Sequence, residues 1–460
     1  MSDKTLLEKF TSRFSKAFLQ SPSRILIIGF LILILSGTFL LMLPMATVEG
    51  RVGFIDALFT ATSASCVTGL TVLDTGTTYS FFGQMVILFL IQIGGIGIMT
   101  FSTLMLLIAG KRPSMIGHIV LHDTFTHTGE RSPISILKDV ILFTFLVEAV
   151  GSFLLFLRFF PEKGFLNGLY LSVFHSVSAF CNAGFGLFPD NFVSYQQDWL
   201  LNLVLCGLII SGGIGFLIMS ELMSSFPLNK RKLSRLSLHT KFVLSATIFL
   251  LVFSTLVIAF MEWGNALGSL PVPDRFLASF FQAVSARTAG FNTLIIGNLT
   301  AETLFFIIVL MFIGASPGSC AGGVKITTAS LLVLVGLSQL NGRENPQIFH
   351  RTFSKASIDK AIGVVMVSLL VICAVTMLLL MCERFTVNHG KFLDLLFEAV
   401  SGFGTVGLST GVTPGLSVAG KIFISFIMFI GRVGPLTVVM AVSRSSKKYY
   451  NYAEENIMIG

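Results

Sequence analysis

The residues with the clearest chemical potential belong to four short segments that recur along the chain. Each segment begins with Phe, runs through small and hydroxyl-bearing residues, and is followed by a tripeptide that ends in glycine. Four copies in register indicate an internal repeat. The repeated segments are 59–64, 174–179, 281–286 and 397–402, and the tripeptides are Val67, Thr68 and Gly69; Asn182, Ala183 and Gly184; Thr288, Ala289 and Gly290; Thr405, Val406 and Gly407.

Backbone carbonyls are the chemistry that these tripeptides offer. Glycine adopts backbone conformations closed to other residues and leaves no side chain in the way. Four such loops around one axis would turn their carbonyl dipoles toward a central column, where they can replace the hydration shell of K+. The helices before them would aim their partly negative C-terminal ends inward, which favours a cation. The pattern predicts a selectivity filter that binds K+ at backbone carbonyls.

A second row of glycines follows each tripeptide by 24 to 28 residues, and its members are Gly94, Gly212, Gly314 and Gly431. Glycines inside spanning helices also serve as packing notches between helices, and that reading stays open for Gly94, Gly97, Gly212 and Gly215. A polar residue recurs one position after each repeated Phe. We interpret this set as hydrogen-bonding anchors for the short helices, because a buried polar group needs a partner; it comprises Thr60, His175, Gln282 and Glu398.

The composition requires an apolar solvent around the chain. Hydrophobic residues make up 53% and charged residues 12%, against roughly 25% charged residues in a soluble domain. The net charge of +8 is distributed among the gaps between apolar stretches and is not gathered on one domain, which argues against a nucleic-acid partner. The lipid bilayer is the expected environment.

Eight apolar stretches are long enough to span a bilayer, and a shorter, half-apolar stretch lies within each successive pair. We therefore predict an all-α integral membrane protein with eight transmembrane helices, in which four helix–pore-loop–helix repeats surround a central pore with pseudo-fourfold symmetry. The predicted parts are a cytoplasmic amphipathic helix at 1–24, repeat 1 at 25–110, repeat 2 at 138–225, repeat 3 at 240–340, repeat 4 at 357–443 and a cytoplasmic tail at 444–460.

Basic residues gather in one alternate set of loops, which indicates the cytoplasmic side by the positive-inside rule. With an even number of spans, both termini lie on that side. The residues that carry the signal are Lys111, Arg112 and Arg131; Lys230, Arg231, Lys232 and Arg235; Arg343, Arg351 and Lys355; Arg444, Lys447 and Lys448.

The third repeat differs from the others, because its last helix is interrupted by a run that is too rich in Gly, Ser and Pro for a regular helix. The interruption, at 314–325, falls at membrane depth below the predicted filter, so we expect it to act as a gate; a simple helix kink is the alternative. The gate residues predicted here are Gly314, Ala315, Ser316, Pro317, Gly318, Ser319, Gly322, Gly323 and Lys325.

Arg432 follows Gly431 directly and places a charge in the middle of a span. Such a charge costs about 2.5–3.5 kcal/mol on insertion scales and indicates a functional site. We expect it either to slow cations electrostatically or to hold the gating loop by its carbonyls. A purely structural arginine–carbonyl anchor is the competing interpretation.

These motifs resemble the Ktr/Trk/HKT superfamily of K+ transporters, and the size is similar to that of the bacterial Ktr membrane subunit. The resemblance rests on the fourfold unit, the single glycine per loop, the 314–325 break and the motif from Gly431 to Pro435. It implies K+ uptake across the bacterial plasma membrane by a homodimer, promoted by Na+ and regulated by a cytoplasmic nucleotide-binding ring of the RCK/KTN type. Gly69, where some members have Ser, favours K+. The resemblance implies no covalent cofactor, and nucleotide would bind only to the partner subunit.

Two other classes of protein fit the sequence less well, namely coupled secondary transporters and enzymes. A Na+- or H+-coupled secondary transporter of another small cation typically shows inverted repeats, whereas these repeats run parallel and no span carries paired acidic residues. An enzyme is not predicted, because the chain lacks the H-E-x-x-H and G-x-S-x-G motifs and His175 stands alone in its span.

Overall fold

The structure of the chain is a computed structural model, which describes residues 22–97, 133–224, 236–342, 346–349 and 351–434. In these ranges the fold is almost entirely helical. The α-helices are α2 (Pro22–Leu41), α3 (Phe54–Ser65), α4 (Thr75–Thr78), α5 (Phe81–Ile96), α8 (Pro133–Lys163), α9 (Phe165–Phe180), α10 (Trp199–Ile214), α11 (Phe216–Ser224), α13 (Leu238–Glu262), α14 (Val272–Ser285), α15 (Ala301–Phe312), α16 (Ile326–Leu340), α17 (Lys355–Cys382), α18 (Phe392–Gly404) and α19 (Val418–Val433).

Short elements fill the connections between these helices. Five single 3₁₀ turns and one antiparallel hairpin occur within the described ranges. They are η1 (Pro44–Ala46), η2 (Val193–Tyr195), η3 (Ile296–Asn298), η4 (Glu383–Phe385), η5 (Thr413–Gly415) and the strands β1 (Gln347–Ile348) and β2 (Arg351–Thr352).

Four helices that occupy matching places begin with the same device. The side chains of Ser80, Asp198, Thr300 and Ser417 each accept a hydrogen bond from a backbone N–H in the first turn of α5, α10, α15 and α19. Such N-caps satisfy donors that a helix leaves free at its start. The repeated cap fixes where each of these helices begins.

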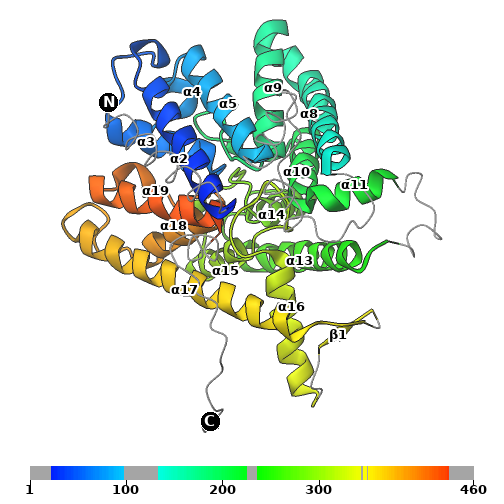
Figure 1. The fold of residues 1–460 in the computed structure, drawn as a ribbon. Coiled ribbons are helices and arrows are strands. Elements are labelled where there is room, and N and C mark those ends of the chain that lie inside the picture. The colour runs from blue at the N-terminus through cyan, green and yellow to red at the C-terminus, as the bar shows by residue number, and fades with distance from the viewer. Residues whose placement is uncertain (1–21, 98–132, 225–235, 343–345, 350, 435–460) are drawn as a thin grey trace, which may run out of the picture.

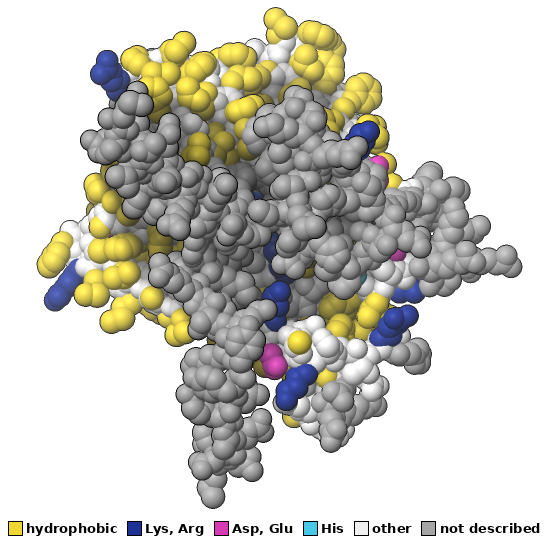
Figure 2. All heavy atoms as spheres, in the orientation of Figure 1, with side chains coloured by type: hydrophobic (Ala, Val, Ile, Leu, Met, Phe, Trp, Pro, Cys, Tyr) yellow, Lys and Arg dark blue, Asp and Glu magenta, His cyan; other side chains and the backbone are white. Residues whose placement is uncertain are grey.

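Three helical stretches in the described ranges are long and apolar enough to cross a membrane: Lys138–Lys163, Leu238–Glu262 and Lys355–Phe385. Their outer faces carry exposed large apolar side chains, among them Phe145, Phe249 and Leu370. Figure 2 shows such side chains along the upper and left rim of the molecule. A soluble surface rarely exposes so continuous an apolar patch, so this rim is suited to lipid.

The helices form four successive groups, one for each predicted repeat: α2 to α5, α8 to α11, α13 to α16, and α17 to α19. These groups follow one another around the centre of Figure 1, from blue through cyan and green to orange. In each group, the apolar helix that follows the tripeptide packs against the short helix that precedes the tripeptide of the next group. These pairs are α5 with α9, α10 with α14, α15 with α18, and α19 with α3. The fourth pair returns to the first group, so the contacts close into a ring.

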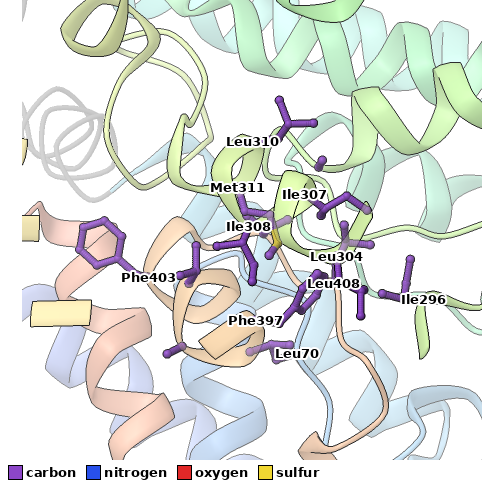
Figure 3. Close-up of a cluster of buried hydrophobic side chains, with 14 of the residues drawn as sticks. Leu70, Ile296, Leu304, Ile307, Ile308, Leu310, Met311, Phe397, Phe403 and Leu408 are labelled. Carbon is purple, nitrogen blue, oxygen red and sulfur yellow. The ribbon is translucent and has the colours of Figure 1, made fainter. Parts of the chain in front are cut away.

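Apolar side chains pack behind the tripeptides. Leu70 and Leu408 lie in one buried cluster with Ile308 of α15 and Phe397 of α18 (Figure 3). Each leucine directly follows a tripeptide glycine in the sequence. The tripeptides are thus backed by a close-packed core, which restricts their movement.

The second apolar stretch of repeat 2 does not form one continuous helix. It is divided at Gly215, which has a φ of +97° and separates α10 from α11. The backbone N–H of Phe216 donates to the Gly318 carbonyl instead of continuing the helix. Residues 1–21 of the part predicted at 1–24, the tail at 444–460, and the stretches 98–110 and 435–443 lie outside the described residues, whereas 22–24 form the start of α2.

Candidate ion pathway

The four tripeptide glycines meet one another at the centre of the ring. A β-carbon placed on Gly69 would lie 2.5 Å from the Ala183 oxygen, and one on Gly184 would lie 2.9 Å from the Ala289 oxygen. One on Gly290 would lie 2.5 Å from the Val406 oxygen, and one on Gly407 would collide with the Thr68 oxygen. Each loop therefore touches the next, and the fourth touches the first. We call Gly69, Gly184, Gly290 and Gly407 the ring glycines.

All four ring glycines line the floor of one open cavity of about 390 Å³. Two carboxylates, Asp74 and Asp190, stand on its walls. Both are engaged locally: Asp74 caps α4, and Asp190 accepts from the N–H and hydroxyl of Ser194. The negative wall raises the local concentration of cations at the entrance to the ring.

The backbone of each tripeptide is wound in a pattern that other residues rarely adopt. Positive φ values occur at the first residue of all four, namely Val67, Asn182, Thr288 and Thr405, and again at all four ring glycines. A non-glycine residue in this region is strained, and such strain concentrates at functional sites. In an extended strand successive carbonyls alternate in direction; reversal of φ at alternate residues allows them to face one side.

A serine behind each loop holds this backbone in place. The main-chain oxygens of these serines accept a hydrogen bond of 2.8 or 2.9 Å from the middle residue of each tripeptide. Two of the hydroxyls also accept from the N–H groups of Gly69 and Gly407. The serines are Ser63, Ser178, Ser285 and Ser401. Their role was missed in the sequence, although their identity in all four repeats was the available signal.

Three of the four polar residues that follow the repeated Phe anchor their short helices by a hydrogen bond, and the fourth does not. The Thr60 hydroxyl accepts from Tyr79, His175 Nε2 accepts from the Leu187 N–H at 3.1 Å, and the Glu398 carboxylate accepts from Ser409 and Thr413. Each bond ties a short helix to the chain that follows its tripeptide. The buried amide of Gln282 has no hydrogen-bond partner within the described residues.

Residues 313–325 between α15 and α16 form a non-helical loop that runs directly beneath the tripeptides. Its Gly322 N–H donates to the Thr405 hydroxyl at 3.0 Å, which couples the loop to the fourth tripeptide. The N–H of Ser316 donates to the Gly213 oxygen, and the N–H of Gly323 donates to the Gly431 oxygen. Loop 313–325 thus bridges α10 and α19 from opposite sides of the ring.

Loop 313–325 lacks a helical hydrogen-bond ladder and is held by scattered internal bonds, which include those from the N–H and hydroxyl of Ser319 to the Ser316 oxygen. The Gly314 N–H donates to the Val324 oxygen, and the Lys325 ammonium donates to the Ala321 oxygen at 2.6 Å. Gly318 and Gly323 have positive φ. The remaining predicted loop residues, Ala315 and Pro317 to Ser319, lie in the same segment.

Arg432 joins three of the four helix groups by its guanidinium. Its Nη1 donates to the Cys320 oxygen of loop 313–325, and its Nη2 donates to the Gly94 oxygen of α5. The residue itself belongs to α19. Both acceptors are carbonyl oxygens, so the predicted arginine–carbonyl contact to the loop is present, and the positive charge lies beside the loop.

The second-row glycines let α5, α10 and α19 approach the helices that precede the tripeptides. β-carbons placed on Gly94, Gly212 and Gly431 would collide with the carbonyl oxygens of Ser65, Phe180 and Phe403 respectively. Those oxygens lie at the C-terminal ends of α3, α9 and α18. The packing-notch interpretation thus describes Gly94 and Gly212, and Gly431, for which it was not considered, makes the same kind of contact.

The side chains of the described residues do not form a site for a tightly bound metal ion. Within the described residues no group of three His, Cys, Asp or Glu side chains could hold one. Glu148 of α8 is buried and accepts two hydrogen bonds from the Gln92 amide, a carboxylate that the sequence reasoning overlooked.

Comparison with known families identifies the architecture. A family model for TrkH, described as a cation transport protein, matches residues 5–452. The chain belongs to the TrkH family of cation transport proteins. This TrkH-family chain is 40% identical over 442 residues to the Ktr system potassium uptake protein B of Bacillus subtilis, covering 96% of this chain and 97% of that protein.

Two further comparisons agree with the family. The potassium/sodium uptake protein NtpJ of Enterococcus hirae is 36% identical over 445 residues, covering 96% of the TrkH-family chain and 97% of that protein. The crystal structure of the potassium transporter TrkH from Vibrio parahaemolyticus shares the fold with a TM-score of 0.72 at 17% identity, covering 92% of this chain and 85% of that one.

Proposed function

We propose that the protein takes up K+ across the bacterial plasma membrane through a filter made of the four tripeptide loops, with one glycine per loop. The closed ring of Gly69, Gly184, Gly290 and Gly407 at the floor of one cavity is the observation that carries this proposal. Backbone carbonyls that converge on one column can replace the hydration shell of K+. The potassium-uptake names of two relatives support the choice of cation.

The proposed architecture is a pseudo-fourfold arrangement of four repeats with eight transmembrane helices. The cyclic contacts between successive groups support the fourfold order. The cavity above the ring glycines would then be the outer vestibule, and both termini would lie in the cytoplasm, as the distribution of basic residues predicts.

The proposed gate is loop 313–325 together with Arg432. The loop lies across the path directly below the tripeptides, and Arg432 holds it through the Cys320 oxygen. Ions would pass once the loop leaves this position. A loop without a helical hydrogen-bond ladder can move at a lower free-energy cost than a packed helix.

The assembly proposed for this chain follows the family resemblance. It is a homodimer on a cytoplasmic ring of nucleotide-binding subunits, with transport promoted by Na+. The name of the B. subtilis relative places that protein in a Ktr system, and NtpJ is named for both K+ and Na+. No nucleotide or covalent cofactor would be held by this chain itself.

Gly290→Ser tests the filter. The new β-carbon would lie 2.5 Å from the Val406 oxygen and 3.0 Å from the Gly184 α-carbon, so the ring must deform. We expect the KM for K+ uptake to rise by about tenfold and the preference for K+ over Na+ to narrow. Uptake is measured in cells that lack their own K+ systems.

Gly50→Ser is the matched control, because Gly50 also has a positive φ, of +77°, but its β-carbon position meets nothing within 4 Å. It should leave both the KM and the ion preference unchanged. Unaltered kinetics in the Gly290 variant would contradict a filter at this position.

A further inference from the structure

The third tripeptide is preceded by a charged residue that the other three lack. Arg287 stands directly before Thr288, where the matching residues are Cys66, Cys181 and Gly404. Its side chain is buried, with the residue only 6% exposed. Consecutive α-carbons are about 3.8 Å apart, so this side chain leaves the backbone immediately beside the loop.

The hydrogen-bonding groups of Arg287 are largely unused. Its Nη2 donates to the Thr247 hydroxyl at 3.5 Å, a long contact, and its Nε has no partner. Within the described residues no carboxylate lies within ion-pair distance of it. A buried guanidinium normally uses its five donors to offset the cost of losing water.

Arg275, on the helix α14 that precedes this turn, shows what a structural arginine does in this fold. Its three nitrogens donate to the carbonyl oxygens of Leu270, Trp263 and Gly268 at 2.8 to 3.1 Å, and the guanidinium lies 4.8 Å from the Trp263 ring centre. Arg287 makes no comparable set of bonds. An anchoring role therefore does not account for its presence.

The space around Arg287 does not hold a neutralising anion of any size. The cavity that it lines measures about 10 Å³ and is bordered by Thr247, Gly213 and Ala315. Such a volume accepts about one water molecule. A carboxylate or phosphate cannot enter, so the charge remains uncompensated beside the tripeptide.

We propose that Arg287 is a fixed positive charge behind the third tripeptide loop that weakens cation binding in the filter and so speeds release. This inference rests on the proposed function. An unpaired charge acts strongly across a low-dielectric interior. A conducting filter must bind ions well enough to admit them and weakly enough to let them leave. Placement in one loop of four would weaken binding without closing the pore to cations.

Two independent variants remove the charge. Arg287→Met deletes it, and Thr247→Asp neutralises it in place, because aspartate has nearly the volume of the threonine that Arg287 already contacts and needs no added space. Each should lower the KM for K+ uptake by about tenfold and also lower the maximal rate, because ions leave more slowly. K+ binding to the purified wild-type and variant proteins, measured by calorimetry, should tighten by the same factor.

The matched controls are Arg287→Lys, which preserves the charge, and Thr247→Asn, which has the shape of the aspartate without its charge; both should retain the wild-type KM. An unchanged KM in the Arg287→Met and Thr247→Asp variants, or their failure to fold while both controls fold, would overturn the proposal by making Arg287 structural. Arg287→Lys kinetics that match those of Arg287→Met would also overturn it. Absence of K+ uptake and binding in the wild-type protein would instead reject the proposed function itself.

Discussion

At the scale of single residues, the proposed ion pathway is built mainly from backbone, and the side chains hold that backbone in place. Ser63 and Ser401 bind the N–H groups of Gly69 and Gly407, and Glu398 receives two hydroxyls. Arg432 is different, because it donates to loop 313–325, the proposed gate, and not to one of the proposed filter loops. Its bonds therefore bear on opening more than on selectivity.

Arg432→Ala should raise the maximal rate of K+ flux. The change removes the hydrogen bond to the Cys320 oxygen and the bond to the Gly94 oxygen, so the loop loses its tie to α5 and α19. A hydrogen bond from a charged donor contributes about 1.5–3 kcal/mol. Flux is measured in proteoliposomes, with Arg432→Lys expected between the two. Loss of folded protein in the Ala variant would favour a structural anchor.

The composition of the tripeptides was predictable from the sequence, because four glycines recur behind four copies of one segment. The direction of single side chains was not. Nothing local shows that Arg275 turns to three carbonyls whereas Arg287, twelve positions later, turns into a small cavity. Those directions depend on which helices from other groups pack beside α14.

At the scale of elements, the long apolar helices follow from composition, and the break at 314–325 follows from its Gly, Ser and Pro content. The division between α10 and α11 does not. The stretch around Gly215 is apolar enough to continue, but Gly215 has a φ of +97° and the Phe216 N–H donates to the Gly318 oxygen of loop 313–325. A contact made more than 100 residues later in the chain cannot be inferred from local sequence.

Gly215→Ala tests whether this division positions the gate. The added β-carbon would lie 2.6 Å from the Pro317 oxygen and 2.9 Å from the Ser316 hydroxyl, so loop 313–325 must shift. A positive φ also strains alanine by about 1–3 kcal/mol. We expect a higher rate of K+ flux from the displaced loop.

Gly207→Ala on α10 is the matched control for that experiment. Its β-carbon position meets nothing within 4 Å, and alanine favours the helix by about 1 kcal/mol over glycine. Flux should equal that of the wild type. Equal flux in the Gly215 variant, with normal amounts of folded protein, would show that the division has no part in gating.

At the scale of the whole molecule, the four groups form a pathway only because the last group returns to the first. The sequence predicts four equivalent units but not which faces they join. That order is set by packing: α19 lies against α3, although they stand at opposite ends of the chain. The same junction brings the fourth tripeptide beside the first, where Gly407 meets the Thr68 oxygen.

An ion pair joins α19 to α3 at this junction, and its removal should destabilise the whole ring. Lys421 of α19 binds Asp56 of α3 at 2.7 Å, with side chains 14% and 29% exposed. Lys421→Ala leaves the carboxylate unpaired in a partly buried site, so we expect the melting temperature of the purified protein to fall by about 2–4 °C. Lys163→Ala is the control, because Lys163 pairs only with its neighbour Glu162 at the surface, where such pairs contribute about 0–1 kcal/mol. Equal melting temperatures for the two variants would mean that apolar packing alone closes the ring.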